Sequence, residues 1–453
     1  MNSKENYLQG MNKSNLHPKG RMGVALMTVA LLSACGSSSK NDEHENTHVE
    51  TEGRLSIFDV DAQSLKVIDL EDGSVMDSFV LDGVSTPRLY SLPEHRYVAV
   101  IQRDDNLVSF LDSGLYTEDH GDHLHDYEED PSLLNFTLTN VKPTHFEAGE
   151  EQAIIFNDGS DESVSSVSVF SAESIANGET LFDLNRETKM HGAAKLIDGQ
   201  LFVTRRDASI TETTLPAEVE RYSVNEDEAS FEERYEAQCS GLHGAGYNHE
   251  TLIFGCSDGI LTIDLQDENY TATKFDGPES MDEYSRIGSV YAHHDVEALV
   301  TKGGSQLFST VVEEGEVTYQ ELKLDEGVTA LGQNFTPNGE FFWVVGDDEK
   351  LYLWNVEESW SVSSFAISDA EITAVAVASS AANHHLYVLD VENKKVITVD
   401  YESGSAEESV NLDFTPSGIA WMGLAEHDHD HDHDEDHDEE EDGEHEEAHD
   451  DEV

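Results

Sequence analysis

The sequence predicts an all-β fold, a β-propeller with eight blades, or seven as the alternative, and three observations support this. Short alternating apolar runs recur between residues 54 and 424, with hardly a convincing helical period among them. The runs group into units of about 40 to 50 residues, which is the length of a propeller blade. The first unit lacks an inner strand and a spare one remains at 417–424, so pairing the two would close the ring and protect both sheet edges.

The first unit is predicted to be a meander of three strands at 54–60, 65–70 and 75–81, joined by Asp, Gly and Ser turns. Each later unit is expected to begin with a small apolar inner strand and to continue with strands such as 351–355 or 386–390. These units start near Pro87, Pro143, His191, His243, Ile287, Leu331 and Ile372. The propeller domain is therefore predicted to span residues 54–425.

The N-terminal segment has the composition of an export signal. Basic residues precede an apolar run at 22–32 that is too short to span a bilayer as a permanent helix. The run ends in Leu32-Ser33-Ala34-Cys35, which resembles a bacterial lipobox. We therefore expect residues 1–34 to be a lipoprotein signal peptide and Cys35 to be lipidated, an ordinary signal peptide being the alternative. Translation could begin at Met1 or at Met11.

This signal predicts a protein of the periplasm or cell envelope that touches the membrane only through its lipid anchor. Residues 35–53 are rich in Ser, Asn and Glu and are predicted to form a flexible tether. The chain carries 95 acidic and 25 basic residues, which argues against nucleic acid as a partner and favours cations or basic partners. Adaptation to salty water would explain the same acidity. We expect a monomer.

The last 28 residues, 426–453, form an acidic tail with almost nothing apolar to bury, and are predicted to be disordered. Imidazole and carboxylate are ligand types for Zn²⁺, and the tail contains no Lys or Arg. Its strict His-Asp alternation favours a metal-collecting arm over a merely solvated acidic segment. The histidines of the arm are His427, His429, His431, His433, His437, His445 and His449.

Further histidines gather within the propeller domain. A loop at 119–125 holds several metal-ligand side chains within seven residues, and its HxH spacing can place two imidazoles near one ion. Three more histidines stand at the start of inner strands in consecutive blades, so they should converge on one rim of the central channel. With the loop nearby, the set would supply a tetrahedral zinc site, although single histidines there could simply hydrogen-bond to backbone. The candidates are His120, Asp122, His123, His125, His145, His191 and His243.

Two further features belong to the same part of the chain. His249, His293 and His294 fall near inner hairpin turns on the opposite face, where they could form a second metal site or be exposed turn residues. Cys239 and Cys256 flank a predicted hairpin that turns near Asn248. Because they fall nearly opposite one another and export permits oxidation, we expect a disulfide that joins the first two strands of one blade.

At these residues the sequence resembles the AztD-type zinc metallochaperones, which are extracytoplasmic β-propellers. The resemblance rests on an ordered set of motifs: Asp119 to His125, Lys142 to Phe146, His191-Gly192, Cys239 to Gly244 and Phe254 to Gly259. It implies zinc ligands among the seven candidates above and a Cys239–Cys256 pair. It also implies transfer of zinc to the solute-binding protein of an ABC importer. Unlike that family, this chain carries its long His-rich segment at the C-terminus.

The leading functional interpretation is therefore a protein that stores and delivers zinc and is not an enzyme. Transfer needs no catalytic base, only ligands that leave one at a time. The alternative is a propeller metalloenzyme, hydrolase- or lactonase-like, that activates water at an open zinc position. The patterns GxSxG (Gly255 to Gly259) and HExxH (His44 to His48 and His445 to His449) do occur, but in a predicted hairpin and in predicted disordered segments. The strand-turn-helix and helical settings that these signatures require are not predicted there, which weakens this alternative. A surface propeller with a metal-buffering tail is the third possibility.

Overall fold

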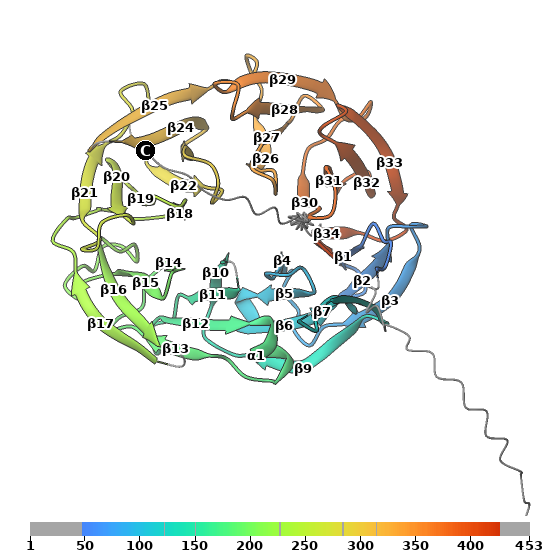
Figure 1. Cartoon of the computed structure of the whole chain (residues 1–453), viewed down its shortest axis with the longest axis horizontal. Helices are drawn as coiled ribbons and strands as arrows, with labels where there is room; N and C mark the ends of the chain where they lie inside the picture. Colours follow the sequence, from blue (N-terminus) through green and yellow to red (C-terminus); the bar gives the residue numbers. More distant parts are fainter. Residues whose placement is uncertain are drawn as a thin grey trace, which may run out of the picture. The chain divides into compact units, whose positions relative to one another are not determined.

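The structure is a computed structural model, and it describes residues 48–121, 123–149, 151–225, 228–282, 285–313 and 315–425. These residues form eight four-stranded antiparallel sheets and one two-stranded hairpin. The sheets follow one another around a ring in chain order (Figure 1). The predicted eight-bladed all-β propeller is confirmed.

The first blade combines the two ends of the domain. Its inner strand is β34 (Pro416–Met422), followed outward by β1 (Arg54–Asp59), β2 (Ser64–Asp69) and β3 (Val75–Val80). Arg54 pairs with Met422 and Asp59 with Pro416, so the last strand closes the ring as the sequence predicts. Closure pairs the inner edge of β1, which would otherwise be unpaired.

The next four blades have the following strands, from the inside outward. Blade 2 contains β4 (Arg88–Ser91), β5 (Tyr97–Gln102), β6 (Leu107–Asp112) and β9 (Ser132–Leu138). Blade 3 contains β10 (Pro143–Ala148), β11 (Gln152–Asn157), β12 (Ser166–Ser171) and β13 (Phe182–Asn185). Blade 4 contains β14 (Ala194–Ile197), β15 (Gln200–Arg205), β16 (Glu218–Asn225) and β17 (Glu228–Arg234). Blade 5 contains β18 (Ala245–Tyr247), β19 (Thr251–Cys256), β20 (Gly259–Asp264) and β21 (Ala272–Asp276).

The last three blades repeat this order. Blade 6 contains β22 (Ile287–Tyr291), β23 (Leu299–Gly303), β24 (Gln306–Glu313) and β25 (Glu316–Leu322). Blade 7 contains β26 (Ala330–Phe335), β27 (Phe341–Gly346), β28 (Lys350–Asn355) and β29 (Ser361–Ala366). Blade 8 contains β30 (Val375–Ser379), β31 (His385–Asp390), β32 (Lys395–Asp400) and β33 (Ser405–Asn411). Two short helices, η1 (Arg103–Asp105) and α1 (Ala172–Ala176), lie in connections of blades 2 and 3.

The core lies between neighbouring blades. One apolar cluster, for example, packs Phe58 and Val67 of blade 1 against Val98 and Leu111 of blade 2, and all four are fully buried. Burying a side chain of this size stabilises the fold by about 1.5 to 3 kcal/mol. Because each blade buries both faces against its neighbours, the strands are continuous apolar runs as often as alternating ones. This packing fixes the inner strands around the channel, where the candidate site lies.

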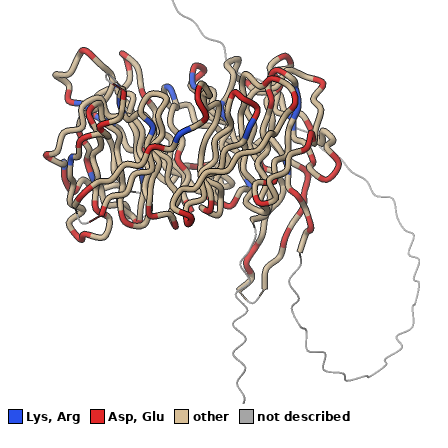
Figure 2. Tube along the Cα trace, turned by 90° about the horizontal axis from the view of Figure 1, so that it is seen from above, with Lys and Arg blue, Asp and Glu red and all other residues tan. Residues whose placement is uncertain are grey.

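The ring has two ends, which differ in the part of the inner strands that they carry. The start face is the end at which the inner strands begin, as β10 does at Pro143. The turn face is the end at which they turn into the second strands, as β10 does after Ala148. Acidic residues follow the loops of the ring, and basic residues are sparse among them (Figure 2).

An insertion in blade 2 projects from the turn face. After β6 the chain forms the hairpin of β7 (Leu115–Asp119) and β8 (Leu124–Glu128) before it returns as β9. Asp112, at the end of β6, pairs with Tyr97, which begins β5 just after the β4–β5 turn. The hairpin therefore leaves the blade at the turn face.

The described end of the predicted tether contacts this same face. The backbone amide of Val49 donates a hydrogen bond to the Asp126 carboxylate at 3.1 Å, and the His48 imidazole lies 3.5 Å from that carboxylate. The Trp421 indole donates to the Glu52 carbonyl at 3.1 Å. Residues 48–53 thus lie against the propeller. Among the described residues, no helix has the length and apolar character that a membrane crossing requires.

The predicted disulfide between Cys239 and Cys256 is present. Its position differs from the expectation in one respect. Cys256 ends β19, but Cys239 lies in the segment before β18 and not on that strand, where its backbone amide donates to the Ala217 carbonyl at 2.8 Å. The bond therefore joins the incoming connection to the second strand of blade 5. Because that connection also carries His243, the disulfide restrains the segment that forms the site.

Candidate metal centre

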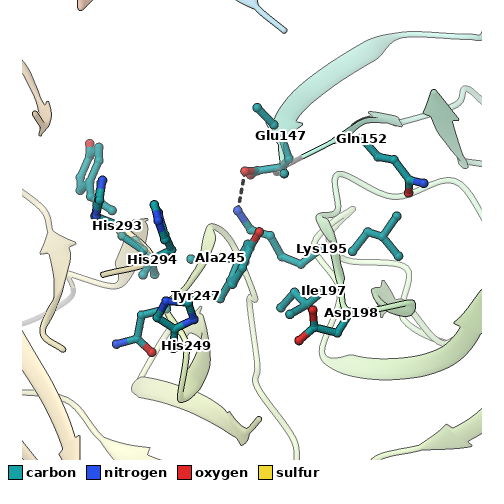
Figure 3. Close-up of a pocket in the computed structure, with 18 of the residues that line it drawn as sticks. Glu147, Gln152, Lys195, Ile197, Asp198, Ala245, Tyr247, His249, His293 and His294 are labelled. Atoms are coloured by element: carbon teal, nitrogen blue, oxygen red, sulfur yellow. Dashed lines mark hydrogen bonds and ion pairs between the residues drawn. The ribbon is translucent and has the colours of Figure 1, made fainter. Parts of the chain in front are cut away.

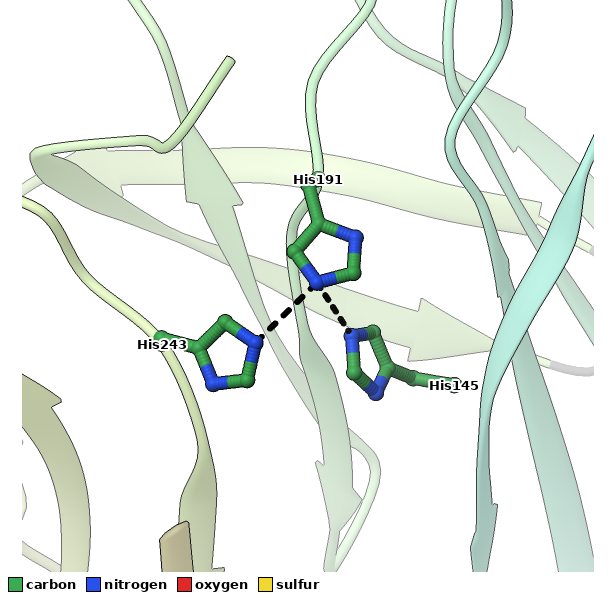
Figure 4. Close-up of side chains that lie close together, drawn as sticks. All are labelled: His145, His191 and His243. Atoms are coloured by element: carbon green, nitrogen blue, oxygen red, sulfur yellow. Dashed lines mark hydrogen bonds between the residues drawn. The ribbon is translucent and has the colours of Figure 1, made fainter. Parts of the chain in front are cut away.

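Three histidines from consecutive blades meet at the start face, as the sequence predicts (Figure 4). His145 lies on β10, whereas His191 and His243 lie in the connections just ahead of β14 and β18. Backbone hydrogen bonds hold both connections: the His191 amide donates to the Thr214 carbonyl at 2.9 Å, and the His243 amide donates to the Gly255 carbonyl at 2.9 Å. The three side chains are half-buried. We call them the histidine triad.

A glycine follows each of the two connection histidines, and the structure shows why. A β-carbon on Gly192 would lie 2.4 Å from the Thr204 hydroxyl and 2.6 Å from the Phe156 ring. Gly244 has a φ of +76°, and a β-carbon there would lie 2.8 Å from the Gly288 carbonyl oxygen. Only glycine allows the chain to pass so close to its neighbours at the crowded axis.

The triad has the spacing of a metal site. The Nε2 atom of His191 lies 3.2 Å from that of His145 and 3.0 Å from that of His243. Nitrogen ligands about 2.0 to 2.1 Å from a tetrahedral Zn²⁺ are separated from one another by about 3.3 Å. The observed distances are close to this value, and they come from three different blades. The triad can therefore close around one ion with only a small movement of the rings.

Hydrogen bonds at the other ring nitrogens fix how the triad is protonated. The Nδ1 atom of His243 lies 2.6 Å from the Gly288 carbonyl oxygen, which can only accept, so this nitrogen donates. The Nδ1 atom of His191 lies 2.9 Å from the Asp158 carboxylate. In the neutral rings, both Nε2 atoms then carry lone pairs that face each other across 3.0 Å. Such lone pairs repel unless a cation or proton lies between them, which is the arrangement of metal-ligating histidine.

Burial keeps two imidazoles of the triad, those of His145 and His243, in the form that binds metal. Burial, followed by the neighbouring imidazoles, lowers the pKa of His145 to about 4. Burial also lowers the pKa of His243. Burial alone would raise the pKa of Asp158, but hydrogen bonds from His191 and Arg103 outweigh it and the pKa falls. At neutral pH these two imidazoles are thus neutral and the Asp158 carboxylate is ionised, as metal binding requires.

Asp158 and Arg103 are the site residues that sequence reasoning missed. The Arg103 guanidinium donates to the Asp158 carboxylate at 2.8 Å and to the Thr144 hydroxyl at 2.9 Å. Asp158 is buried just after β11, and its sequence neighbours Asn157 and Gly159 suggest an ordinary turn. No spacing in the sequence connects it to His191. An acidic residue at the end of the second strand of a histidine-bearing blade is the only signal that could have indicated it.

The 119–125 loop does not join the triad. It forms the tip of the β7–β8 hairpin at the turn face, whereas the triad lies at the start face, so the expectation that it lies near the triad is wrong. Its own imidazoles are gathered, with ring centroids 4.8 to 5.2 Å apart for His120, His123 and His125. The sequence could not reveal the separation, because the hairpin is an insertion within a blade. Asp122 lies outside the described residues.

The predicted second cluster also lies at the turn face, where β18 and β22 end. The Asp295 carboxylate lies 2.8 Å from the His294 Nε2 atom and 3.4 Å from the His249 Nε2 atom. His293, His294 and Asp295 place one ligand atom each within 4.8 Å of one another. However, the Nε2 atom of His293 donates to the Pro337 carbonyl at 2.7 Å, and its Nδ1 atom accepts from the Asp295 amide at 3.3 Å. His249, His294 and Asp295 are therefore the available ligands.

A cavity of about 830 Å³ opens between this cluster and the inner strands (Figure 3). Glu147 and Lys195 form an ion pair within it, and Tyr247 lies 5.8 Å from the ammonium group of Lys195. Glu147 follows His145 by two residues on β10, so the ion pair lies below the triad on the channel side of the same strand. The Glu147–Lys195 pair therefore lies between the triad at the start face and the histidine cluster at the turn face. The two histidine clusters are thus separate sites.

Several predicted site residues lie outside the described part of the chain. They are Cys35 and the tail histidines His427, His429, His431, His433, His437, His445 and His449.

Comparison with known proteins adds independent information. No family model matches the chain. A stretch of 218 residues is 28% identical to the zinc chaperone AztD of Citrobacter koseri. The match covers 47% of this chain and 48% of that protein, so it spans about half the length of the curated relative.

Solved structures resemble the chain over a larger part. Apo AztD from Citrobacter koseri superposes with a TM-score of 0.67 at 21% identity, over 82% of this chain and 98% of that one. A second structure of Citrobacter koseri AztD gives 0.68 at 21% identity, over 83% and 99%. The dihydro-heme d1 dehydrogenase NirN gives 0.57 at 10% identity, over 83% and 76%. The predicted resemblance to AztD-type β-propellers is thus confirmed, in sequence over about half of the chain and in fold over most of it.

Proposed function

We propose that this protein is an extracytoplasmic zinc-binding metallochaperone, which stores zinc and delivers it to the solute-binding protein of a zinc ABC importer. One observation carries the proposal: the Nε2 atoms of His145, His191 and His243 converge within 3.2 Å of His191 while hydrogen bonds hold two of the rings in the ligating tautomer. The similarity to a zinc chaperone over half of the chain supports zinc as the metal.

Delivery fits the triad better than catalysis does. Three protein ligands leave a fourth position open, which suits both ligand exchange and activation of water. Hydrolysis further needs a group that carries protons to or from the substrate, yet the nearby carboxylate of Asp158 already accepts from His191 and Arg103. Ligand exchange needs only that the histidines leave one at a time. Half-burial of the triad keeps it within reach of a partner protein.

The remaining parts of the chain have proposed roles in collecting zinc. The His-Asp tail at 426–453 captures the ion, and lipidation of Cys35 keeps the protein at the membrane of the cell envelope. A soluble wild-type protein whose mature form begins elsewhere would contradict the anchor, as would a Cys35→Ser variant that still sediments with membranes. Two groups of residues on the turn face provide further zinc ligands. One consists of His120, His123 and His125 at the tip of the β7–β8 hairpin, and the other of His249, His294 and Asp295.

The central experiment isolates the triad from the tail. A chain that ends at Ala425 keeps every described strand, since β34 ends at Met422. Zinc titration under chelator competition should show one tight site in this chain, and replacing both His191 and His243 with Ala should abolish it. Circular dichroism checks that the variant remains folded. A folded double variant that binds zinc as tightly as before would refute the proposal.

A further inference from the structure

A second cavity, of about 570 Å³, opens beside the triad. His243 forms one of its walls, and the others come from blades 6 and 7, with Arg286, Tyr291 and Lys302 from the first and Gln333 from the second. The cavity therefore adjoins the triad on the blade 6 side of His243. Whatever enters it reaches His243 directly.

Two basic side chains face this cavity without a carboxylate partner. Lys302 donates to the amide oxygen of Gln333 at 3.3 Å, and the amide of Gln333 donates to the Tyr291 hydroxyl at 2.5 Å. In the described part of the chain, neither Lys302 nor Arg286 has an acidic group within ion-pair distance. The protein has 95 acidic and 25 basic residues, so acidic partners are abundant.

Two other basic residues near the channel are paired with carboxylates. Lys195 pairs with Glu147, and Arg103 pairs with Asp158. Arg286 and Lys302, by contrast, line the cavity beside His243 without such a partner among the described residues. Two uncompensated positive charges beside a cation site weaken cation binding unless an anion is also bound.

A bound zinc ion makes this balance more unfavourable. Three neutral imidazoles leave its charge of +2 uncompensated, and Arg286 and Lys302 add positive charge in the cavity beside His243. An anionic ligand would compensate the charge of the zinc ion and also the charges of Arg286 and Lys302. A carboxylate suits the space best, since one oxygen can bind the metal while the other accepts hydrogen bonds from guanidinium or ammonium.

We infer that a carboxylate, held by Arg286 and Lys302 in this cavity, supplies the fourth ligand of the metal in the triad. The inference rests on the proposed function, because it needs a metal there. The carboxylate comes from a small organic acid or from an Asp or Glu side chain of the receiving protein. In the second case the same contact begins the ligand exchange that removes the ion.

The test uses Co²⁺ as the probe, because tetrahedral Co²⁺ absorbs visible light much more strongly than octahedral Co²⁺. The full chain is loaded, and the spectrum of a His191→Ala/His243→Ala variant, which keeps the tail, is subtracted. Acetate is then titrated into the wild type and into an Arg286→Gln/Lys302→Met variant. A Lys274→Gln/Lys323→Gln variant removes the same charge from residues that pair with Asp258 and Glu321.

Acetate should change the difference spectrum of the wild type and the control, with half-saturation at least about tenfold higher in the cavity variant. Cobalt affinity should not fall in that variant. Equal acetate binding in all three proteins would overturn the inference while leaving the metal site intact. A wild type without a tetrahedral difference spectrum would remove the metal site itself, and the inference with it. Repeating the titration with a glutamate-containing peptide separates the sources: saturation at lower concentration than acetate indicates a protein side chain.

Discussion

Replacing Asp158 with Asn removes the charge that orients His191, and the structure gives the size of the effect. The carboxylate lies 2.9 Å from the His191 Nδ1 atom and 2.8 Å from the Arg103 guanidinium. Loss of a carboxylate that supports a metal-ligating histidine typically reduces metal affinity by about 10- to 100-fold, or about 1.4 to 2.7 kcal/mol. We expect the upper part of this range.

The reason lies in what Asn cannot do. A single amide oxygen replaces two carboxylate oxygens, so it supports His191 less well and leaves the charge of Arg103 uncompensated near the metal. The positive charge then repels the ion in addition to the lost orientation of the ring. The backbone contacts of residue 158, which include its amide donating to the Lys142 carbonyl at 2.9 Å, do not depend on the side chain. The fold should therefore survive.

Zinc affinity is measured by competition with a chromophoric chelator at neutral pH, in full-length proteins that share the same tail. Asp161→Asn is the matched control, because Asp161 carries the same charge in the same blade but lies exposed, with a side chain 88% accessible, and pairs with Lys189. Thermal unfolding of the metal-free proteins checks their stability. If the affinities of the two variants agree within measurement error, Asp158 does not act through His191 and the reasoning fails.

Three further predictions address stability and the other clusters. The pKa of His145 is about 4 in the folded chain, against 6.5 for a free imidazole. Between these two pH values the His145 imidazole is therefore protonated in the unfolded chain but not in the folded one. The metal-free protein should therefore lose up to about 3 kcal/mol as pH falls through this window, and urea unfolding should show a smaller loss for His145→Asn. Replacing both His249 and His294 with Ala should remove zinc binding at the turn face without affecting the triad; an unchanged anomalous zinc signal between them in crystals would disprove this. Removal of residues 426–453 should slow zinc loading most at low ionic strength, because the acidic tail attracts the ion; equal stopped-flow rates with and without the tail at every salt concentration would argue against a collecting role.

The fold could be predicted from the sequence because its signals are local and repeated. Alternating apolar runs predict strands, and a recurring unit length predicts blades. The first unit lacks an inner strand and a spare strand remains at the end, which predicts ring closure between residues 416–422 and 54–59. Position within such a unit then implies position around the ring. This is why His145, His191 and His243 could be expected to meet although up to 98 residues separate them.

The chemistry around the triad was decided only by the tertiary structure. Asp158 and Arg103 reach His191 from the second strand of blade 3 and a connection of blade 2, and Gly288 contributes a backbone carbonyl. No periodic pattern marks these contacts, since they depend on side-chain direction and on packing between blades. The same holds for the 119–125 loop, which an inserted hairpin carries to the turn face. A repeat determines which residues share a rim; the packing of one blade on the next determines what those residues touch.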